Sequence, residues 1–125
     1  VAAAKALKLT RPDIRMVLVG DIDIDNPNSI SSNRLNSWVG NIVEHWGYSH
    51  EIAATMARAN VIVLPSYREG LPKCLIEAAA CGRSVITTDV PGCRDAILPG
   101  QTVSYCVELG DLLGLVNIDF VIPFQ

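Results

Sequence analysis

Short runs of aliphatic and β-branched residues alternate along the chain with longer segments rich in alanine, leucine and charged residues. Such short apolar runs, bounded by polar or turn residues, are typical of strands buried on both faces of a parallel sheet. They predict strands at residues 15–19, 41–46, 60–64 and 84–87. Helices are predicted at residues 1–9, 31–39, 50–59 and 71–81. This alternation predicts an α/β fold with a Rossmann-like parallel sheet and flanking helices.

The most informative stretch is residues 65–82, which read PSYREGLPKCLIEAAACG. It follows the strand at 60–64 and passes through a loop into the helix predicted at 71–81, where Pro72 suits the first turn and Gly82 ends the helix. A helix that begins at the carboxyl edge of a parallel sheet presents unpaired amide groups and the positive end of its dipole. This stretch therefore predicts a helix start that binds a phosphorylated ligand.

Two carboxylates accompany this helix start, Glu69 in the loop and Glu77 in the helix, with seven residues between them. Glu77 should lie roughly 7–9 Å along the helix axis from its start. A diphosphate bound there would place its ribose beside Glu77 and its far substituent near Glu69, while Gly70 allows close approach of the backbone. Either glutamate alone is better explained as a solvated surface charge, but the combination favours a nucleotide ligand.

Residues 64–96 closely resemble the donor-nucleotide domain of the retaining glycosyltransferases of family 4, whose hallmark is a glutamate pair with this spacing (E-x7-E). Glu69 and Glu77 fall on the two positions of that motif. The resemblance extends from Val1 to the region of Gly100. The features that are similar to the capsule and surface-polysaccharide members are Gly20, the loop at 26–31, Trp38 and the segment 43–47.

The resemblance implies an enzyme of the hexosyltransferase type that transfers a sugar from a nucleotide-diphosphate donor to a saccharide or lipid-linked acceptor in surface polysaccharide synthesis. No metal or other cofactor is expected. Glu69 would be the catalytic residue at the donor sugar, so Glu69→Ala should lower turnover. Glu77 would hold the ribose, so Glu77→Ala should weaken nucleotide binding. The other donor-binding positions are Gly20, Tyr48, Gly70, Leu71, Lys73 and Cys74.

Some of these positions have simpler explanations from the residues alone. Tyr48 is equally well explained as an ordinary turn aromatic, and Lys73 is better explained as a solvated lysine in the first helical turn. His45 in a strand and His50 at a helix start have no visible catalytic partner, so structural roles are favoured for both. The nucleotide base would pack at the turn that contains Tyr48 only if the resemblance holds there.

The chain is interpreted as one incomplete donor-binding domain over residues 1–125, the C-terminal half of a GT-B enzyme. Neither an N-terminal acceptor domain nor the first donor-domain strand, which supplies a diphosphate-binding arginine and lysine in the family, is recognisable. We therefore expect weak nucleotide binding and no transfer by the isolated chain. An inactive nucleotide-binding fragment and a nucleotide-sugar 2-epimerase-like enzyme stay open as alternatives. Residues 111–125 depart from the family pattern and are interpreted as an altered or cropped end.

Composition narrows the function classes further. Half of the residues are hydrophobic and 18% are charged, which indicates a globular chain. A net charge of -3 without a basic cluster argues against nucleic acid as a partner. The absence of a G-x-G-x-x-G motif after a strand argues against a dinucleotide dehydrogenase. The four cysteines form no C-x-x-C pair and are expected to be reduced, mostly buried thiols of a cytoplasmic protein, with a disulfide framework as the less favoured alternative.

The remaining expectations concern membranes and metals. No apolar run reaches transmembrane length, so the protein is expected in the cytoplasm, with peripheral contact at the inner membrane face through the full-length protein as a further option. The acidic segment 21–26 begins like a calcium loop. The calcium template requires glycine at its sixth position and glutamate at its twelfth, where this chain has Asn26 and Ser32. We therefore predict a solvated acidic loop and no metal site.

Overall fold

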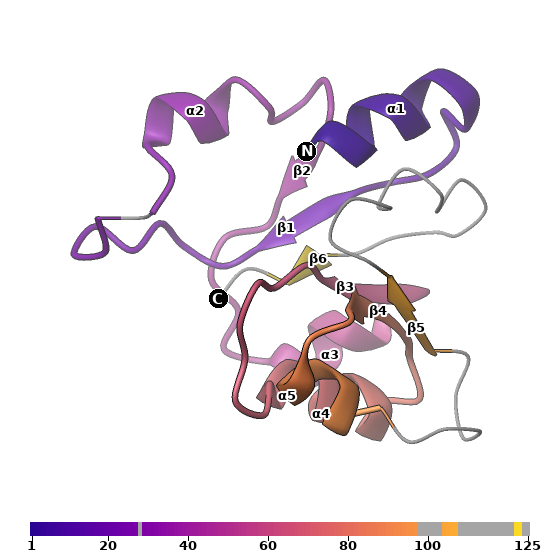
Figure 1. Ribbon diagram of the computed structural model, residues 1–125. Coiled ribbons are helices and arrows are strands. Elements are labelled where there is room, and N and C mark those ends of the chain that lie inside the picture. Colours follow the sequence, from indigo (N-terminus) through magenta and orange to yellow (C-terminus); the bar gives the residue numbers. More distant parts are fainter. Residues whose placement is uncertain (28, 98–103, 108–121, 124–125) are drawn as a thin grey trace.

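The computed structural model describes residues 1–27, 29–97, 104–107 and 122–123 (Figure 1). The helices of this part are α1 (Ala2–Thr10), α2 (Ser32–Asn36), α3 (Ile52–Ala57), α4 (Lys73–Ala80) and α5 (Pro91–Asp95). The strands are β1 (Val17–Val19), β2 (Glu44–His45), β3 (Val61–Leu64), β4 (Ser84–Thr88), β5 (Ser104–Val107) and β6 (Ile122–Pro123). Helices and strands alternate along most of this part, as the sequence predicts.

The strands form two short sheets, and every strand pairing among the described residues is parallel. One sheet has the order β2-β1-β6 and the other the order β3-β4-β5. In the second sheet Ile62 lies opposite Val85, and Val85 lies opposite Ser104. Strand β6 pairs with β1 and also contacts β3, so it lies between the two sheets. The α/β class with parallel sheets is therefore confirmed.

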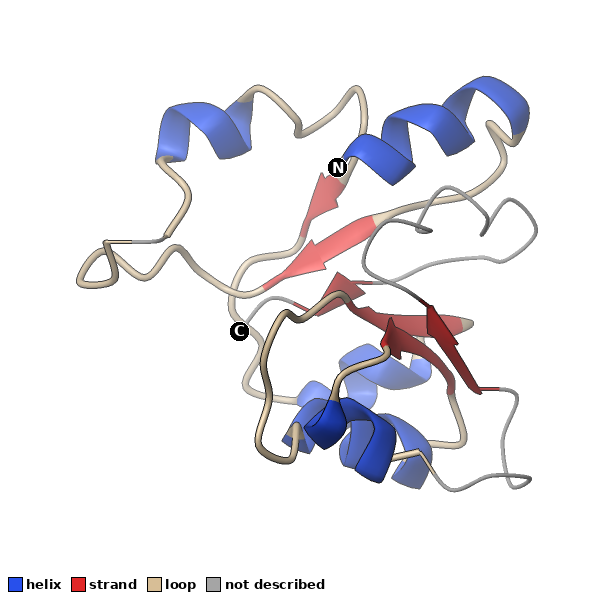
Figure 2. Ribbon diagram, viewed as in Figure 1, coloured by secondary structure: helices blue, strands red, loops and turns tan. Residues whose placement is uncertain are grey.

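Helices cover both faces of the strands (Figure 2). Helices α1 and α2 lie on one side, and α3, α4 and α5 lie on the other. Alternate residues of β3 point to opposite sides: Val61 and Val63 join the core cluster under α1 and α2, whereas Ile62 and Leu64 join the cluster under the other helices. Because both faces are buried, a strand at this place must be apolar at every position, which is why the run 60–64 is so readily recognised.

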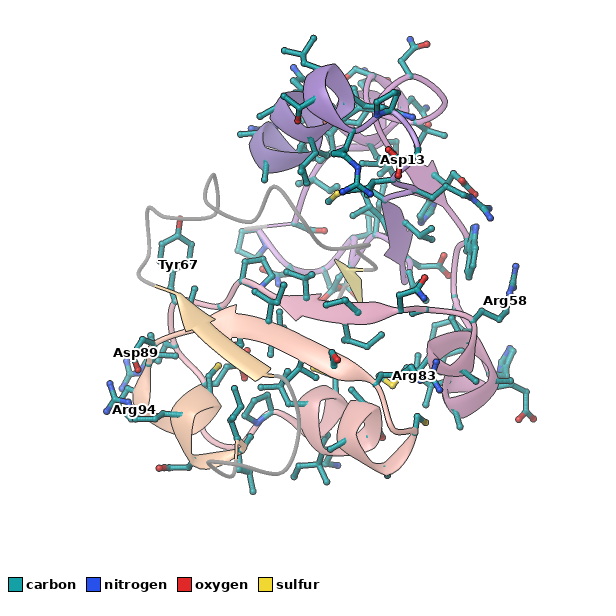
Figure 3. The ribbon with its side chains drawn as sticks, turned by 90° about the vertical axis from the view of Figure 1, so that its right-hand side faces the viewer. Asp13, Arg58, Tyr67, Arg83, Asp89 and Arg94 are labelled. Atoms are coloured by element: carbon teal, nitrogen blue, oxygen red, sulfur yellow. The ribbon has the colours of Figure 1, made fainter. Side chains whose placement is uncertain are left out.

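The ends of the helices follow the sequence signals closely, with small shifts. The side chain of Ser31 caps α2 by accepting a hydrogen bond from the Arg34 amide at 3.3 Å. Gly82 ends α4 with a φ of 65°, a left-handed conformation that glycine adopts without strain. Next to it, the Arg83 guanidinium donates to the carbonyls of Cys81 at 3.0 Å and Ala59 at 3.2 Å, which ties the end of α4 to the segment after α3 (Figure 3).

Several predicted boundaries are wrong by a few residues. Helix α4 begins at Lys73, so Pro72 is its N-cap and does not lie in the first turn. The predicted strand at 41–46 is reduced to β2, which among the described strands pairs only with β1 and lies at the edge of its sheet. The helices predicted at 31–39 and 50–59 are also shorter in the structure. Short helices and edge strands have few packing partners, so their ends are poorly determined by the apolar pattern.

After the last predicted strand the structure contains a further helix, α5, which is not among the predicted helices. Val90 is extended at the N-cap, and Pro91 occupies the first helical position, where its fixed φ suits a helix. Arg94 pairs with Asp89 at 2.7 Å, which holds the helix against the end of β4 (Figure 3). Pro91 is the available sequence signal for this helix. The Pro91-Gly92 pair is also typical of turns, so this signal alone does not predict a helix.

Two further expectations concern the cysteines and the end of the chain. Cys74, Cys81 and Cys93 are free thiols, as predicted, and the side chain of Cys106 lies outside the description. The structure describes only β6 of residues 111–125, so the interpretation of that segment as an altered or cropped end lies outside the described residues. Within the described part, no helix is long and apolar enough to cross a lipid bilayer.

An ion pair joins the segment just before β1 to β2 at the surface. Arg15 donates two hydrogen bonds to the carboxylate of Glu44, at 2.8 and 2.9 Å, and the indole of Trp46 donates a third at 3.2 Å. The guanidinium of Arg58 stacks over the ring of Trp46 at 3.9 Å. The hydrogen bonds from Arg15, with a smaller contribution from Trp46, lower the pKa of Glu44 from 4.5 to about 2.

We expect this pair to stabilise the fold only at pH values where Glu44 is ionised. Because its folded pKa is the lower one, the contribution is present above pH 4.5 and is lost as the pH falls to about 2. Glu44→Gln should therefore lower the free energy of unfolding at pH 7, by less than about 1 kcal/mol because the pair is largely solvated. At a pH of about 2 the substitution should have no effect. Urea unfolding across this pH range measures it, with Glu51→Gln, an exposed glutamate, as the control. A difference that does not change with pH would contradict the assignment.

Candidate functional site

The unit of β3, the loop at 65–72 and α4 carries most of the predicted site residues. The strand is buried, while Gly70, Leu71 and Lys73 are exposed around the start of the helix. No side chain caps α4, because its N-cap is Pro72. The amide of Leu75 bonds to the carbonyl of Pro72 at 3.2 Å. Exposed residues thus lie on both sides of the helix start, while the N-cap Pro72 itself is buried.

Both predicted glutamates lie close to the thiol of Cys74. Burial, followed by the negative charges of Glu69 and Glu77, raises the pKa of this thiol to about 11, and Cys93 contributes less. Glu77 follows Cys74 by three residues and therefore shares its side of α4. The charges of both Glu69 and Glu77 therefore act on the same thiol in the first turn of α4. Glu77 is exposed and Glu69 is half-buried.

The position of Cys74 limits what it can offer a ligand. Its side chain is 4% exposed and belongs to the core cluster under α4. With a raised pKa, the thiol keeps its proton at neutral pH. Of the predicted donor-binding groups, Cys74 can therefore contribute its backbone amide and not its sulfur. Leu71 can likewise offer a hydrogen bond only through its backbone, because its side chain, although 56% exposed, has no polar group.

The carboxylate of Glu69 has a defined hydrogen-bond partner. The hydroxyl of Ser66 donates to Oε1 of Glu69 at 2.7 Å and lies 3.3 Å from the carbonyl of Arg68. The carbonyl of Ser66 accepts a hydrogen bond from Oγ1 of Thr88, at the end of β4. The loop after β3 is therefore tied at Ser66 to the neighbouring strand, and its glutamate is tied to Ser66.

Helix α5 closes the other side of this loop. Gly92 is buried, and a Cβ at this position would overlap the carbonyl oxygens of Glu69 and Gly70 and would lie 2.6 Å from the carbonyl carbon of Gly70. Only a residue without a side chain permits such a close approach of two backbones. The α5 helix therefore supports the backbone that carries Glu69.

Gly20 and Tyr48 belong to a second group, at the ends of β1 and β2. The amide of Gly20 donates to the carbonyl of Gly47 at 2.8 Å, and a ring nitrogen of His45 lies 2.7 Å from the carbonyl of Gly20. Tyr48 is 64% exposed and contacts His50 edge to face, with 4.8 Å between the ring centroids. This arrangement gives His45 a structural hydrogen bond and leaves the ring of Tyr48 open to solvent.

The structure does not join these two groups by direct contact. Within the part of the chain it describes, no hydrogen bond or ion pair links Gly20 or Tyr48 to the loop at 65–72 or to α4. They are connected through the core, because Val17 and Val19 of β1 pack in the same cluster as Leu64 and Leu75. A ligand that contacted both groups would have to span the space between them.

The described residues form a hollow beside Gly20, and neither Glu69 nor Glu77 lines it. It has a volume of 160 Å³ and is lined by Leu18, Gly20, Asp21, Ile22, Asp23, Asn26, Ser29, Ile30, Leu35 and His45. Pockets that enclose a drug-sized ligand usually have volumes of about 300–1,000 Å³. This hollow is therefore too small to hold a nucleotide sugar by itself, and the exposed rim of α4 is the better candidate for most of the ligand.

The acidic loop after β1 shows no grouping suited to a metal. The amide of Asp25 donates to the side chain of Asp23 at 3.2 Å, and Asp21, Asp23 and Asp25 are all exposed. Among the described residues, no three histidine, cysteine, aspartate or glutamate side chains lie together in a way that could hold a metal ion. That the protein works without a metal stays a prediction.

Sequence reasoning did not single out Ser66, Thr88 or Gly92. A serine three residues before a glutamate can form a local hydrogen bond, and this spacing was the available signal for Ser66. Thr88 lies 22 positions after its partner Ser66, and Gly92 lies 22 positions after its neighbour Gly70. Their contacts depend on strand pairing and helix packing, which the local sequence does not contain.

Comparison with known proteins adds independent evidence. The sequence model of the family described as "Glycosyl transferases group 1" matches residues 1–117. The chain is 40% identical over 81 residues to an N,N'-diacetylbacillosaminyl-diphospho-undecaprenol alpha-1,3-N-acetylgalactosaminyltransferase of Campylobacter jejuni. This match covers 65% of this chain and 20% of the relative. It is 34% identical over 110 residues to a D-inositol 3-phosphate glycosyltransferase of an Arthrobacter species, and this match covers 82% of this chain and 25% of the relative.

A third relative has a name related to surface polysaccharides. The chain is 31% identical over 105 residues to a capsular polysaccharide biosynthesis glycosyltransferase of Staphylococcus aureus, and the match covers 84% of this chain and 27% of the relative. The chain thus spans less than a third of the length of each of these three relatives.

Proposed function

Because the chain belongs to the family of group 1 glycosyl transferases, we propose that it forms the donor-nucleotide-binding half of a retaining GT-B glycosyltransferase of family 4, built on a Rossmann-like sheet. The reaction transfers a hexose-type sugar from a nucleotide diphosphate to a saccharide or lipid-linked acceptor in surface polysaccharide synthesis. The observation that carries this proposal is the placement of Glu69 and Glu77 near one thiol at the exposed start of α4.

The proposed binding mode follows from the exposed groups around α4. The diphosphate lies at the first turn, where the amides of Lys73 and Cys74 and the positive end of the helix dipole attract negative charge. The ribose lies along the helix and bonds to the carboxylate of Glu77. The base extends toward Gly20 and Tyr48, whose exposed ring offers a surface for packing.

In the transfer itself, the bond between the anomeric carbon of the sugar and the diphosphate oxygen breaks, a bond to an acceptor hydroxyl oxygen forms on the same face, and the hydroxyl proton passes to the departing diphosphate. The electron pair of the broken bond leaves with the diphosphate, so negative charge develops at the start of α4. Fixed amide dipoles aimed at such a charge lower the barrier without having to reorganise. Glu69 contacts the donor sugar at the reacting end, and no metal is required in this scheme.

The names of the relatives support the substrate classes in this proposal. One relative is named for a sugar acceptor linked to diphospho-undecaprenol and one for capsular polysaccharide synthesis. An acceptor carried on a lipid would place the reaction at a membrane surface, and we propose a cytoplasmic protein that works at the inner face of the membrane, with the acceptor bound by another domain.

Titration with nucleotide sugars tests the proposal. We expect UDP-N-acetylgalactosamine, UDP or GDP-mannose to shift the backbone amide resonances of residues 70–77 together with those of Gly20 and Tyr48. Binding should weaken with added salt, because the ligand is a diphosphate. NAD serves as the control for a dinucleotide-binding fold and should cause no shifts at these positions. The absence of shifts with all three ligands, or shifts confined to the acidic loop at 21–26, would contradict the proposal.

A further inference from the structure

We propose that Ser66 is a positioning residue for Glu69, whose hydroxyl group holds the glutamate carboxylate in the orientation needed at the donor sugar. The inference rests on the proposed function for the role of Glu69, but its geometric part does not. It follows from the hydrogen bond of 2.7 Å between Oγ of Ser66 and Oε1 of Glu69.

The hydroxyl of Ser66 has one hydrogen and two nearby acceptors. The carboxylate oxygen of Glu69 is closer than the carbonyl oxygen of Arg68, at 2.7 Å against 3.3 Å. Hydrogen bonds to an ionised acceptor are also roughly twice as strong as those between neutral groups. The hydrogen is therefore directed at the glutamate.

The surroundings of Glu69 explain why such a bond matters. The neighbouring residues Tyr67, Arg68 and Gly70 are exposed, with Tyr67 81% exposed. Packing therefore restricts the half-buried side chain of Glu69 only in part. A glutamate that is free to rotate would lose its rotamer freedom when the ligand binds, which weakens binding. The Ser66 hydroxyl removes part of that freedom before the ligand arrives.

Ser66 is itself held in place by its backbone. Two successive threonines of β4 bond to carbonyls at and beyond the end of β3: Oγ1 of Thr87 donates to Leu64 at 2.8 Å, and Oγ1 of Thr88 donates to Ser66. Both threonines are buried. Because these bonds end on backbone carbonyls, replacing the Ser66 side chain leaves them intact. Ser66→Ala should therefore remove the contact with Glu69 and preserve the loop.

The experiment measures the affinity of the chain for UDP-N-acetylgalactosamine and for UDP by calorimetry. We expect Ser66→Ala to weaken binding of the sugar nucleotide about tenfold, as the loss of a hydrogen bond to a charged group implies, and to change UDP affinity by less than about twofold. Ser66→Thr keeps the hydroxyl and should restore the affinity. The matched control is Ser37→Ala, which removes a hydroxyl that bonds the Arg34 carbonyl at 2.7 Å in α2.

Other outcomes would overturn the proposal. Equal losses for the two ligands, together with a lower melting temperature, would show that Ser66 serves only the fold. Unchanged affinity for the sugar nucleotide would show that its hydroxyl is not needed.

A measurement without ligand separates this inference from the proposed function. Side-chain coupling constants from NMR should show one dominant rotamer of Glu69 in the native chain and averaging among rotamers in Ser66→Ala. If the native chain binds no nucleotide sugar, the proposed function fails and the coupling constants still decide whether Ser66 orients Glu69. If Glu69 is equally averaged in both proteins, the positioning role is wrong, whatever the chain binds.

Discussion

Replacing Gly92 by alanine is expected to lower the free energy of unfolding by about 2–3 kcal/mol. A methyl group at this position would overlap the carbonyl oxygens of Glu69 and Gly70, and both are backbone atoms that cannot rotate away. Alanine is the better helix former by about 1 kcal/mol, but this gain is small beside the overlap. We therefore expect destabilisation, with α5 pushed away from the loop, as measured by urea unfolding and by the amide resonances of Glu69 and Gly70.

The glycine on the opposite side of the same contact provides the control. A Cβ on Gly70 would have no atom within 4 Å, and its φ lies outside the left-handed region. Gly70→Ala should therefore leave the free energy of unfolding unchanged or raise it by about 0.4–1 kcal/mol through the unfolded state. If Gly92→Ala were as stable as the native chain, α5 would not pack against the loop as described.

The second large effect is expected for Glu77→Ala, which should weaken UDP binding about 30- to 100-fold. The reason is the net loss of about one hydrogen bond between the Glu77 carboxylate and the ribose, which contributes about 1.5–3 kcal/mol because one partner is charged. Since Glu77 is exposed on the surface of α4, the substitution should not reduce stability. Calorimetric titration of the native chain and the variant measures the difference.

A modified ligand makes this prediction specific to the ribose. The native chain should bind UDP more tightly than 2′,3′-dideoxy-UDP, and Glu77→Ala should bind both equally. Asp95→Asn removes one negative charge from an exposed helical position elsewhere and is the control for general electrostatics. If the variant still discriminated between the two ligands, Glu77 would not contact the ribose, and the assignment of the motif would need revision.

The sequence predicts the centre of this fold better than its edges. The strand at 60–64 and the helix that follows it are correct because β3 is buried on both faces and α4 carries strong helix formers. By contrast β2 has one neighbouring strand, and α5 consists of five residues beginning at a proline. Such elements are stabilised mainly by contacts with distant parts of the chain, which the local pattern does not report.

The candidate site shows the same division. Glu69 and Glu77 are recognisable from their spacing and from the family they resemble, and the structure places them near the same thiol. The bond from Thr88 and the contact of Gly92 are tertiary features that arise only when β4 and α5 are packed beside the loop. Cys74 is predicted as a donor contact, and because its side chain lies in the core, only its backbone amide is available for that role.

Cys74 in the first turn of α4 and Cys81 at its C-cap differ in accessibility, which is useful for chemical modification. Cys74 is buried and its pKa is raised, so electrophilic reagents should not reach a thiolate there at neutral pH. Cys93 is fully buried as well, whereas Cys81 is partly accessible at the opposite end of the helix, where its sulfur lies 3.8 Å from the carbonyl of Ala53. Among the cysteines whose side chains the structure describes, Cys81 is therefore the natural attachment point for a fluorophore or spin label, one helical turn after Glu77, whose carbonyl accepts the Cys81 amide at 3.0 Å.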